Sequence, residues 1–312
     1  MVRCLITGGA GFGGSGLTHA LLNKGYDVRV LDMTAPLHAS LVADVLDQID
    51  YRWKSVFDIS REDVEDCDIV LHFAAQPDVP MGFSSPRWTI YNNVMGTTAV
   101  LEACRDVKRI EKVLVASSGN AVQRPLYLPI DEKHPPNAVN PYGASKACQE
   151  IIAFAYHRAY NIPVVVYRNG VIVGKGMRRE IFIFRWLYNI LQNKPIIVEG
   201  YPIADQTRDI THVSDTLAAW LLGIEAKPEK VVGELFQISY GQELSVEEIA
   251  KLCMKVCGRE VPIIRKPHRA GEKGMRELFD TSKARKILGY DPKIPPEKTI
   301  QLTKEWIETE IL

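Results

Sequence analysis

The sequence predicts an α/β fold in which a doubly wound parallel sheet is followed by a smaller α/β region. Short apolar runs alternate with helix-like patterns through the first half of the chain. The apolar runs are continuous, which is typical of parallel strands that are buried on both faces. Strands that alternate with helices form βαβ units, and right-handed crossovers then make the sheet doubly wound.

Each predicted strand is a short apolar run, and each predicted helix has apolar residues at helical spacing. The strands are expected at residues 2–7, 28–32, 51–57, 69–73, 113–116 and 164–167. The helices are expected at residues 16–24, 41–49, 90–105 and 142–160. Gly25 suits the position just past the first helix, where a left-handed backbone favours glycine.

The pattern changes after about residue 174, where mixed segments are interrupted by Pro and Gly. A chain of 312 residues is long enough for about two domains. We therefore expect a first domain at residues 1–173 and a smaller substrate-binding region at 174–312. Residues 205–223 are expected to pack back on the first domain.

Composition excludes several classes of protein. Lys plus Arg and Asp plus Glu are both 38, so the chain lacks the positive excess of a general nucleic-acid binder. No apolar run reaches the roughly 20 residues of a membrane-spanning helix, and the first residues have no signal-peptide pattern. The six cysteines include no CxxC pair and show no metal-ligand spacing. We expect a cytoplasmic protein with reduced thiols, no metal, no nucleic-acid partner and no membrane partner.

A glycine-rich turn follows the first predicted strand and opens the first helix. Gly8, Gly11 and Gly14 permit a tight turn and close approach of the backbone to a pyrophosphate at the helix N-terminus. Asp32 ends the second predicted strand, where an acid accepts hydrogen bonds from a ribose hydroxyl. No basic residue directly follows Asp32, which favours NAD over NADP. The first domain is therefore predicted to be a Rossmann-type NAD-binding domain.

A second group of residues is expected to transfer the proton in the reaction. Tyr142 and Lys146 are four residues apart and project from one helix face. The Lys146 ammonium favours the phenolate of Tyr142, which then takes a proton from a sugar hydroxyl. Ser118 ends the fifth predicted strand and can hydrogen-bond the same oxygen, because ligands of open α/β sheets lie at strand C-termini. Ser118, Tyr142 and Lys146 are the predicted catalytic residues.

Together these motifs resemble the extended short-chain dehydrogenase/reductase family, in the branch that modifies nucleotide-sugars. The similar segments are TGGAGFGGSG at residues 7–16, HFAAQ at 72–76, YNNVMGT at 91–97, PYGASK at 141–146, QTRD at 206–209 and RAGE at 269–272. The resemblance implies cofactor contacts by Gly8, Gly11, Phe12, Gly13, Gly14, Asp32, Asp58, Ile59, Phe73, Ala74, Ala75, Asn93, Tyr142 and Lys146. It implies substrate contacts by Ser118, Arg208 and Arg269, and it adds Asn169 and Arg178 as candidates.

The family includes several reactions, and the residues favour one of them. A 4,6-dehydratase of this family has Asp and Glu after its catalytic Ser or Thr, whereas Gly119 and Asn120 stand there in this chain. A 4-epimerase needs only Ser118, Tyr142, Lys146 and NAD. The resemblance therefore implies an NAD-dependent nucleotide-sugar 4-epimerase that acts by transient oxidation at C4 and hydride return.

Other functions stay open as alternatives. A 4,6-dehydratase and a keto-sugar reductase share the fold, although a reductase usually takes NADPH. A regulatory NAD-sensing protein is the non-enzyme alternative, against which the intact Ser118, Tyr142 and Lys146 argue. The substrate is expected to be a nucleotide-diphosphate sugar, namely UDP-glucose, UDP-galactose or UDP-glucuronate. Arg178 suits either a uronate carboxylate or the diphosphate.

The chain departs from the family at some substrate-contacting positions, and the family also implies an oligomeric state. Val122 and Gln123 stand where the family has Tyr and Gly, and the usual substrate-contacting Asn after the sixth strand is missing. These departures affect substrate contacts more than the redox centre. The family also implies a homodimer that pairs helices near residues 93–105 and 142–160 into a four-helix contact.

Overall fold

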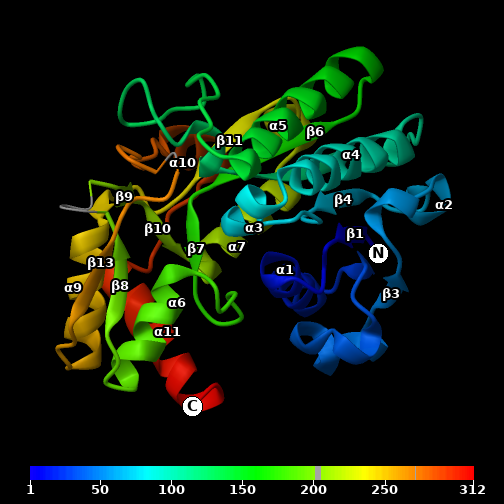
Figure 1. Cartoon of the computed structure of the whole chain (residues 1–312). Helices are drawn as coiled ribbons and strands as arrows, with labels where there is room; N and C mark the ends of the chain where they lie inside the picture. Colours follow the sequence, from blue (N-terminus) through cyan, green and yellow to red (C-terminus); the bar gives the residue numbers. More distant parts are fainter. Residues whose placement is uncertain (201–204, 271) are drawn as a thin grey trace.

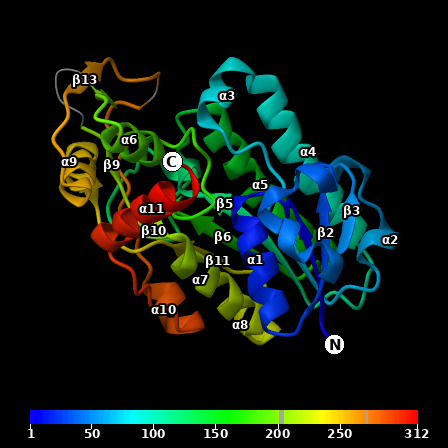
Figure 2. The same ribbon diagram turned by 90° about the horizontal axis from the view of Figure 1, so that it is seen from below.

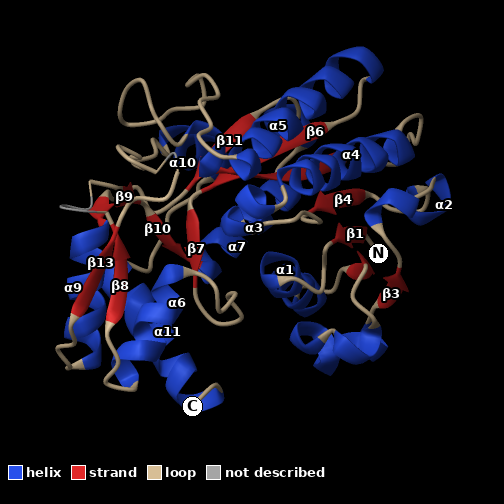
Figure 3. Cartoon of the chain, viewed as in Figure 1, coloured by secondary structure: helices blue, strands red, loops and turns tan. Residues whose placement is uncertain are grey.

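The computed structural model describes residues 1–200, 205–270 and 272–312. Its centre is a seven-stranded parallel sheet with strand order β11-β6-β5-β4-β1-β2-β3 (Figures 1 and 3). The strands are β1 (Arg3–Thr7), β2 (Asp27–Asp32), β3 (Asp50–Trp53), β4 (Ile69–His72), β5 (Lys112–Ser118), β6 (Val164–Asn169) and β11 (Leu235–Ile238). The order reverses between β1 and β4, so the predicted doubly wound Rossmann-type sheet is confirmed.

Helices cover both faces of this sheet (Figure 2). One face is packed by α1 (Phe12–Asn23), α7 (Val213–Glu225) and α10 (Ser282–Leu288). The other face is packed by α2 (Arg61–Val64), α4 (Pro86–Cys104) and α5 (Pro141–Tyr160). Continuous apolar strands thus have two apolar layers to pack against, which explains why they do not alternate with polar residues.

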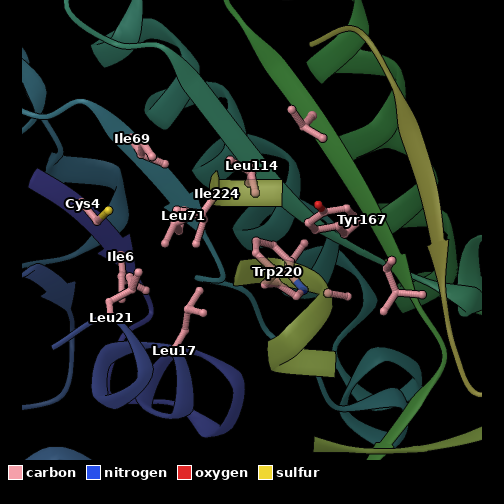
Figure 4. Packing of buried hydrophobic residues seen from close by; sticks show 14 of the residues in the cluster. Cys4, Ile6, Leu17, Leu21, Ile69, Leu71, Leu114, Tyr167, Trp220 and Ile224 are labelled. Atoms are coloured by element: carbon pink, nitrogen blue, oxygen red, sulfur yellow. The ribbon is translucent and has the colours of Figure 1, made fainter. Parts of the chain in front are cut away.

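The layer under α1 and α7 shows how close this packing is (Figure 4). Trp220 of α7 is fully buried, and its ring lies 4.2 Å from the ring of Phe73 and 4.8 Å from that of Tyr167. About one helical turn after Trp220, position 223 requires glycine, because a Cβ there would clash with the hydroxyl of Tyr167. These contacts attach α7 to the sheet. The packing of residues 205–223 as a whole on the first domain stays a prediction.

The smaller region has its own core, formed by α6, α9 and α11 with short strands (Figure 1). Its helices are α6 (Phe182–Leu191), α9 (Val246–Cys257) and α11 (Pro296–Glu310). Its strand pairs are β7 (Val171–Val173) with β10 (Ile210–His212), β8 (Ile196–Glu199) with β13 (Ile263–Lys266), and β9 (Thr207–Arg208) with β12 (Leu244–Ser245). The ring of Phe12 at the start of α1 packs against this core and joins the two regions.

The boundary between the regions is not a single cut at residue 173. Strand β11 and helix α10 come from the second half of the chain, yet both belong to the central sheet layer. The sequence did not predict either element, because both lie in the mixed Pro- and Gly-containing part of the chain and β11 has only four residues. The smaller region therefore consists of separate stretches of chain rather than all of residues 174–312.

Two predicted elements differ in type or length. Residues 41–49 were expected to be an α-helix but form the 3₁₀ segment η2 (Ser40–Gln48). The strand expected at 51–57 is the shorter β3, which lies at the sheet edge, and the chain then turns into η3 (Val56–Asp58). The other short elements are α3 (Val79–Ser84), α8 (Pro228–Val231), η1 (Pro36–His38) and η4 (Gly119–Val122).

All six cysteines are free thiols, and Cys148 is the exposed one. Among the helices within the described ranges, none is long and apolar enough to cross a membrane. The same residues include no group of three or more His, Cys, Asp or Glu side chains placed to hold a metal ion.

Candidate active site

A cleft of about 970 Å³ opens at the carboxyl ends of the central strands and is lined by both regions of the chain. Open α/β sheets bind ligands at this edge, where the strand order reverses. We call one part the cofactor half, formed by residues 8–14, Asp32 and residues 73–75. We call another part the substrate half, formed by Arg178, Arg208, Arg269, Glu272 and Glu277.

The glycine turn of the cofactor half is built by close contact between backbone segments. Gly8 has φ of +74°, and a Cβ there would lie 2.6 Å from the amide nitrogen of Ala74. A Cβ at Gly14 would clash with the carbonyl oxygen of Gly8. Gly11 precedes α1, so the free N–H groups of the first turn face the cleft. This arrangement fits a pyrophosphate held by backbone amides.

Asp32 is held at the end of β2 by two backbone donors. Its carboxylate accepts from the N–H of Ala10 at 2.9 Å and from the N–H of Thr34 at 2.9 Å. These bonds connect the acid to the glycine turn, and Asp32 lines the cleft. An anchored carboxylate beside the turn suits the ribose hydroxyls of a dinucleotide and disfavours a phosphate on that ribose.

Strand β5 and helix α5 bring together Ser118, Tyr142 and Lys146, and all three line the cleft. Helix α5 begins at Pro141, and the side chain of Asn140 caps it by accepting from the N–H of Gly143 at 2.8 Å. The cap fixes the first turn, which carries Tyr142. Lys146 follows one turn later, and its Nζ lies 5.8 Å from the centre of the Tyr142 ring.

Burial shifts the pKa values of this pair toward their neutral forms. Desolvation lowers the pKa of Lys146 to about 7, which the Glu150 carboxylate partly offsets. Desolvation raises the pKa of Tyr142, while the hydrogen bond with Ser118 and the charge of Arg178 act in the lowering direction. Lys146 Nζ donates to the carbonyl oxygen of Ala116 at 2.9 Å, which fixes its position. Lys146 is therefore suited to proton exchange near neutral pH.

Asn120 orients Ser118, a role that the sequence did not predict. Both the backbone N–H and the side-chain Nδ2 of Asn120 donate to Ser118 Oγ, each at 3.2 Å. With these donors on its oxygen, the Ser118 hydroxyl is free to direct its proton toward Tyr142. Gly119 leaves room for a neighbouring ring, since a Cβ there would lie 2.5 Å from Phe279 Cζ.

A buried ion pair between Glu150 and Arg168 lies behind the start of helix α5. Arg168 Nε and Nη2 donate to the two carboxylate oxygens at 2.9 and 2.6 Å, and the side chains are 2% and 6% exposed. Ser117 Oγ also donates to Glu150. The pair joins α5 to β5 and β6, so it supports the elements that carry Ser118, Tyr142 and Lys146 without reaching the cleft.

His72 has a structural role at the end of β4. Its two ring nitrogens are paired with the hydroxyls of Thr7 at 2.8 Å and Thr97 at 2.9 Å. Full burial lowers its pKa to about 3, so the ring is neutral. His72 therefore connects β1 to α4 and is not a base for the reaction.

Arg208 enters the cleft because its neighbour Asp209 is anchored in the interior. Asp209 accepts from the N–H of Gly241 at 3.1 Å, from the N–H of Phe279 at 3.3 Å and from Ser239 Oγ. Burial raises the pKa of Asp209 to about 7. Within the described ranges Arg208 has no carboxylate within ion-pair distance; its Nη1 donates to the Thr207 carbonyl at 2.8 Å. Its charge is thus available to a ligand.

Arg269 lies in the same half but is already partnered. Its guanidinium contacts Glu199 closely and lies 3.9 Å from Glu272. Burial raises the pKa of Glu272, although the Arg269 and Arg208 charges act in the lowering direction. Gly271, between Arg269 and Glu272, lies outside the described residues. Two guanidinium groups facing one cleft are the arrangement expected for a diphosphate.

Glu277 and Gln123 are further cleft residues that the sequence did not indicate. The Glu277 side chain is buried, and its Oε2 has no hydrogen-bond partner among the described residues. Desolvation raises the pKa of Glu277. Gln123 lines the cleft and accepts from Asn140 Nδ2 at 2.5 Å. Neither belongs to a motif with recognisable spacing, although Gln123 stands at a position already noted as a departure from the family.

The other predicted site residues divide into two groups. Gly8, Gly11, Phe12, Gly13, Gly14, Phe73, Ala74, Ala75, Asn169 and Arg178 all line the cleft. Asn169 does so with an amide that is already bonded to the Ser117 carbonyl at 3.2 Å and to Trp220 Nε1 at 3.3 Å. Its contact with substrate stays a prediction.

Asp58, Ile59 and Asn93 do not line the cleft. Asp58 is exposed on η3, whereas Ile59 is buried in the layer under α4. The buried Asn93 amide is bonded to the backbone of Gln76 and to Ser145 Oγ at 2.8 Å. Asn93 thus fixes the loop after β4, and contact of these three residues with cofactor stays a prediction.

Comparison with known proteins agrees with this geometry. The family model described as the NAD dependent epimerase/dehydratase family matches residues 4–239. A putative UDP-glucose 4-epimerase from Methanocaldococcus jannaschii is 33% identical, with 97% of this chain and 98% of that protein aligned. A dTDP-glucose 4,6-dehydratase from Streptomyces niveus is 32% identical, with 98% and 92% aligned.

A solved structure shares both the fold and the cofactor. The UDP-glucuronic acid 4-epimerase from Bacillus cereus, in complex with UDP-glucuronic acid and NAD, superposes with a TM-score of 0.90 at 26% identity. The match covers 98% of this chain and 99% of that one. The glycine turn, the anchored Asp32 and the Ser118–Tyr142–Lys146 group fit the same dinucleotide. This chain is accordingly an NAD-dependent enzyme of the nucleotide-sugar epimerase/dehydratase group and belongs to the NAD dependent epimerase/dehydratase family.

Proposed function

We propose that the chain is a UDP-sugar 4-epimerase. The observation that carries the proposal is the content of the catalytic site: Ser118, Tyr142 and Lys146 are present, while Gly119 and Asn120 follow Ser118 and offer no acid or base. Epimerisation at C4 needs one proton acceptor and no second acid. The group formed by Ser118, Tyr142 and Lys146 thus serves one proton transfer rather than two.

Each residue of the site has its own role in the proposed reaction. Tyr142 Oη accepts the proton of the C4 hydroxyl as C4 becomes a ketone, and it returns that proton when C4 is reduced. The Ser118 hydroxyl and the Lys146 ammonium stabilise the phenolate that accepts this proton. NAD, when bound, supplies the acceptor of the C4 hydride and the donor for its return. Arg208 and Arg269 are proposed to hold the diphosphate.

The candidate sugars are UDP-glucose, UDP-galactose and UDP-glucuronate. Proton NMR in D2O tests them in turn, with UDP-N-acetylglucosamine included and no cofactor added to the purified protein. We expect the C4 epimer to appear without deuterium at C4, because the hydride is returned from within the site. Tyr142→Phe is expected to reduce the rate by at least about 10³-fold, within the range for loss of a proton-transfer group. Absence of an epimer with every sugar, also with NAD supplied, would contradict the proposal.

A 4,6-dehydratase is the second candidate, because of Glu277. This buried carboxyl lines the cleft, and desolvation raises its pKa, so it can carry a proton that Gly119 and Asn120 cannot. The same NMR experiment with dTDP-glucose or UDP-glucose separates the reactions. Loss of water with deuterium at C5 would identify a dehydratase, and Glu277→Gln would then abolish it. An epimer with unlabelled C5 would exclude this candidate for that sugar.

We also propose a homodimer through helices α4 and α5, which lie side by side on one face (Figure 1). Large apolar side chains are exposed there, including Tyr91 and Met95 on α4 and Ile151 on α5. A contiguous exposed apolar surface is typical of a protein interface. Light scattering after size exclusion is expected to give twice the monomer mass, and Ile151→Glu is expected to give a monomer. A monomeric wild-type protein at micromolar concentration would contradict this proposal.

A further inference from the structure

An ion pair closes across the cleft between two loops that are far apart in the sequence. Arg178 Nη1 lies 3.0 Å from Asp78 Oδ2, and Arg178 Nη2 donates to the carbonyl oxygen of Pro77 at 3.1 Å. Asp78 follows β4, whereas Arg178 lies between β7 and α6. Both side chains line the cleft, and they are 34% and 17% exposed for Arg178 and Asp78. The guanidinium is therefore already neutralised by the protein.

Arg178 acts on the reacting end of the cleft. Its positive charge works to lower the pKa of Tyr142. Because Tyr142 and Arg178 line the same cleft, a sugar whose hydroxyl gives its proton to Tyr142 shares that cleft with the guanidinium. Arg178 is thus the group that a negatively charged sugar substituent would meet.

Asp78 is fixed independently of Arg178. Its Oδ1 accepts from the N–H of Met81 at 2.7 Å and caps α3, and its carbonyl oxygen accepts from Gln76 Nε2 at 3.1 Å. The carboxylate cannot leave Arg178 without breaking this cap. A substrate carboxylate that reached Arg178 would share one guanidinium with a fixed like charge, and it would find both Nη groups engaged.

We propose that Asp78 is a specificity-determining residue, which makes the cleft select nucleotide-sugars with an uncharged substituent at C5 over those with a carboxylate. This inference rests on the proposed UDP-sugar function and narrows it to neutral hexoses such as UDP-glucose and UDP-galactose. The hydroxymethyl group of a neutral sugar carries no charge for Asp78 to repel. A uronate would lose affinity by the repulsion and by the competition for Arg178.

Equilibrium binding to the NAD-saturated protein tests this directly, by calorimetry with UDP-glucose and UDP-glucuronate. The wild-type protein is expected to bind UDP-glucose at least tenfold more tightly. Asp78→Asn keeps the α3 cap, because Asn also accepts from the helix N–H, but it leaves the Arg178 guanidinium without its carboxylate partner. We expect Asp78→Asn to bind UDP-glucuronate at least tenfold more tightly than wild type, with UDP-glucose changed less than threefold.

Two control variants test whether the expected gain in affinity for UDP-glucuronate comes from freeing Arg178. Arg178→Gln added to Asp78→Asn is expected to remove the gain for UDP-glucuronate. Glu180→Gln removes another carboxylate that lines the cleft, without freeing Arg178, and is expected to leave the ratio of the two affinities unchanged. A gain of the same size from Glu180→Gln would show a general charge effect and overturn the proposal.

The remaining outcomes are also decisive. Wild-type preference for UDP-glucuronate, or an unchanged affinity ratio in Asp78→Asn, would overturn the role of Asp78. An equal loss of affinity for both sugars in Asp78→Asn would also overturn the role of Asp78, since it would show damage to the loop. Selective binding without formation of an epimer would contradict only the 4-epimerase proposal. Absence of binding by either sugar would contradict both.

Discussion

The cofactor half of the cleft presents mainly backbone, whereas the substrate half presents charged side chains. Gly8 and Gly14 are packed against other backbone atoms, and Asp32 is held by two backbone N–H groups. Arg178 and Arg269 are instead held by carboxylates of the chain itself. Backbone contacts leave little freedom for substitution, while ion pairs can be rearranged one residue at a time. The cofactor half is therefore the part whose sequence is constrained by the fold.

Gly14→Ala should give the largest effect, because it places a Cβ against the carbonyl oxygen of Gly8. The start of α1 would have to move, and we expect a loss of roughly 5 kcal/mol in the free energy of unfolding. Gly11→Ala is the matched control, since its Cβ would lie 3.3 Å from the same oxygen. We expect Gly11→Ala to cost less than about 1 kcal/mol but to weaken NAD binding at least tenfold. Urea unfolding and NAD titration measure both quantities, and equal stability losses would contradict the comparison.

Glu150→Gln tests the buried ion pair that supports helix α5. The change leaves the buried Arg168 guanidinium without a counter-ion, so we expect a loss of about 3 kcal/mol in the free energy of unfolding. Adding Arg168→Met should restore most of this loss, because the unpaired charge is then removed. Chemical denaturation checks both variants. A double variant that is less stable than Glu150→Gln would show that the pair itself stabilises the fold.

Lys146→Met tests the pKa that the buried site imposes. Burial lowers the folded-state pKa of Lys146 to about 7 from 10.5, so the unfolded chain binds more protons between these values. The free energy of unfolding therefore rises with pH in this window, by up to about 1.4 kcal/mol per pH unit from this group. Urea unfolding of the NAD-free protein at pH 7, 8 and 9 should show this slope in wild type. The difference in the free energy of unfolding between wild type and Lys146→Met should change with pH between about 7 and 10.5 and level off above that range. A difference that does not change between pH 7 and 9 would contradict the lowered pKa.

Arg269→Gln should give the smallest effect on stability. Its pair with Glu199 is partly exposed, and such pairs contribute about 0–1 kcal/mol. We expect the free energy of unfolding to change by less than about 1 kcal/mol, while UDP affinity falls at least tenfold. Arg276→Gln is the control, since Arg276 also pairs with a glutamate but does not line the cleft. Similar affinity losses in both variants would argue against Arg269 as a diphosphate ligand.

The same contrast explains how much could be predicted from the sequence. The glycine spacing, Asp32 and the Tyr142–Lys146 pair each follow from a local pattern, because strand ends and helix faces fix where such residues lie. Ser118 was found for the same reason, and all of these residues line the cleft. Six of the seven sheet strands and helices α1, α4 and α5 were also predictable from apolar periodicity.

What could not be predicted depends on contacts between distant segments. Asp78 and Arg178 are separated by 100 residues, and no spacing rule joins them. Glu277 resembles a surface acid in sequence, yet the fold buries it. The 3₁₀ conformation of η2 was missed because apolar spacing alone does not distinguish a 3₁₀ segment from an α-helix. The position of β11 in the central sheet was missed because a short strand does not specify which strand it pairs with.

The interleaved path of the chain limits how this protein can be divided or recombined. Strand β11 and helix α10 belong to the sheet layer, but stretches of the smaller region lie between and after them. A truncation at residue 173 would strip the sheet of an edge strand and of α7, exposing apolar surface on both fragments. Exchange of the smaller region between relatives would require several grafts rather than one fusion junction. New substrate preferences in such a protein are more accessible through point changes at cleft loops than through domain shuffling.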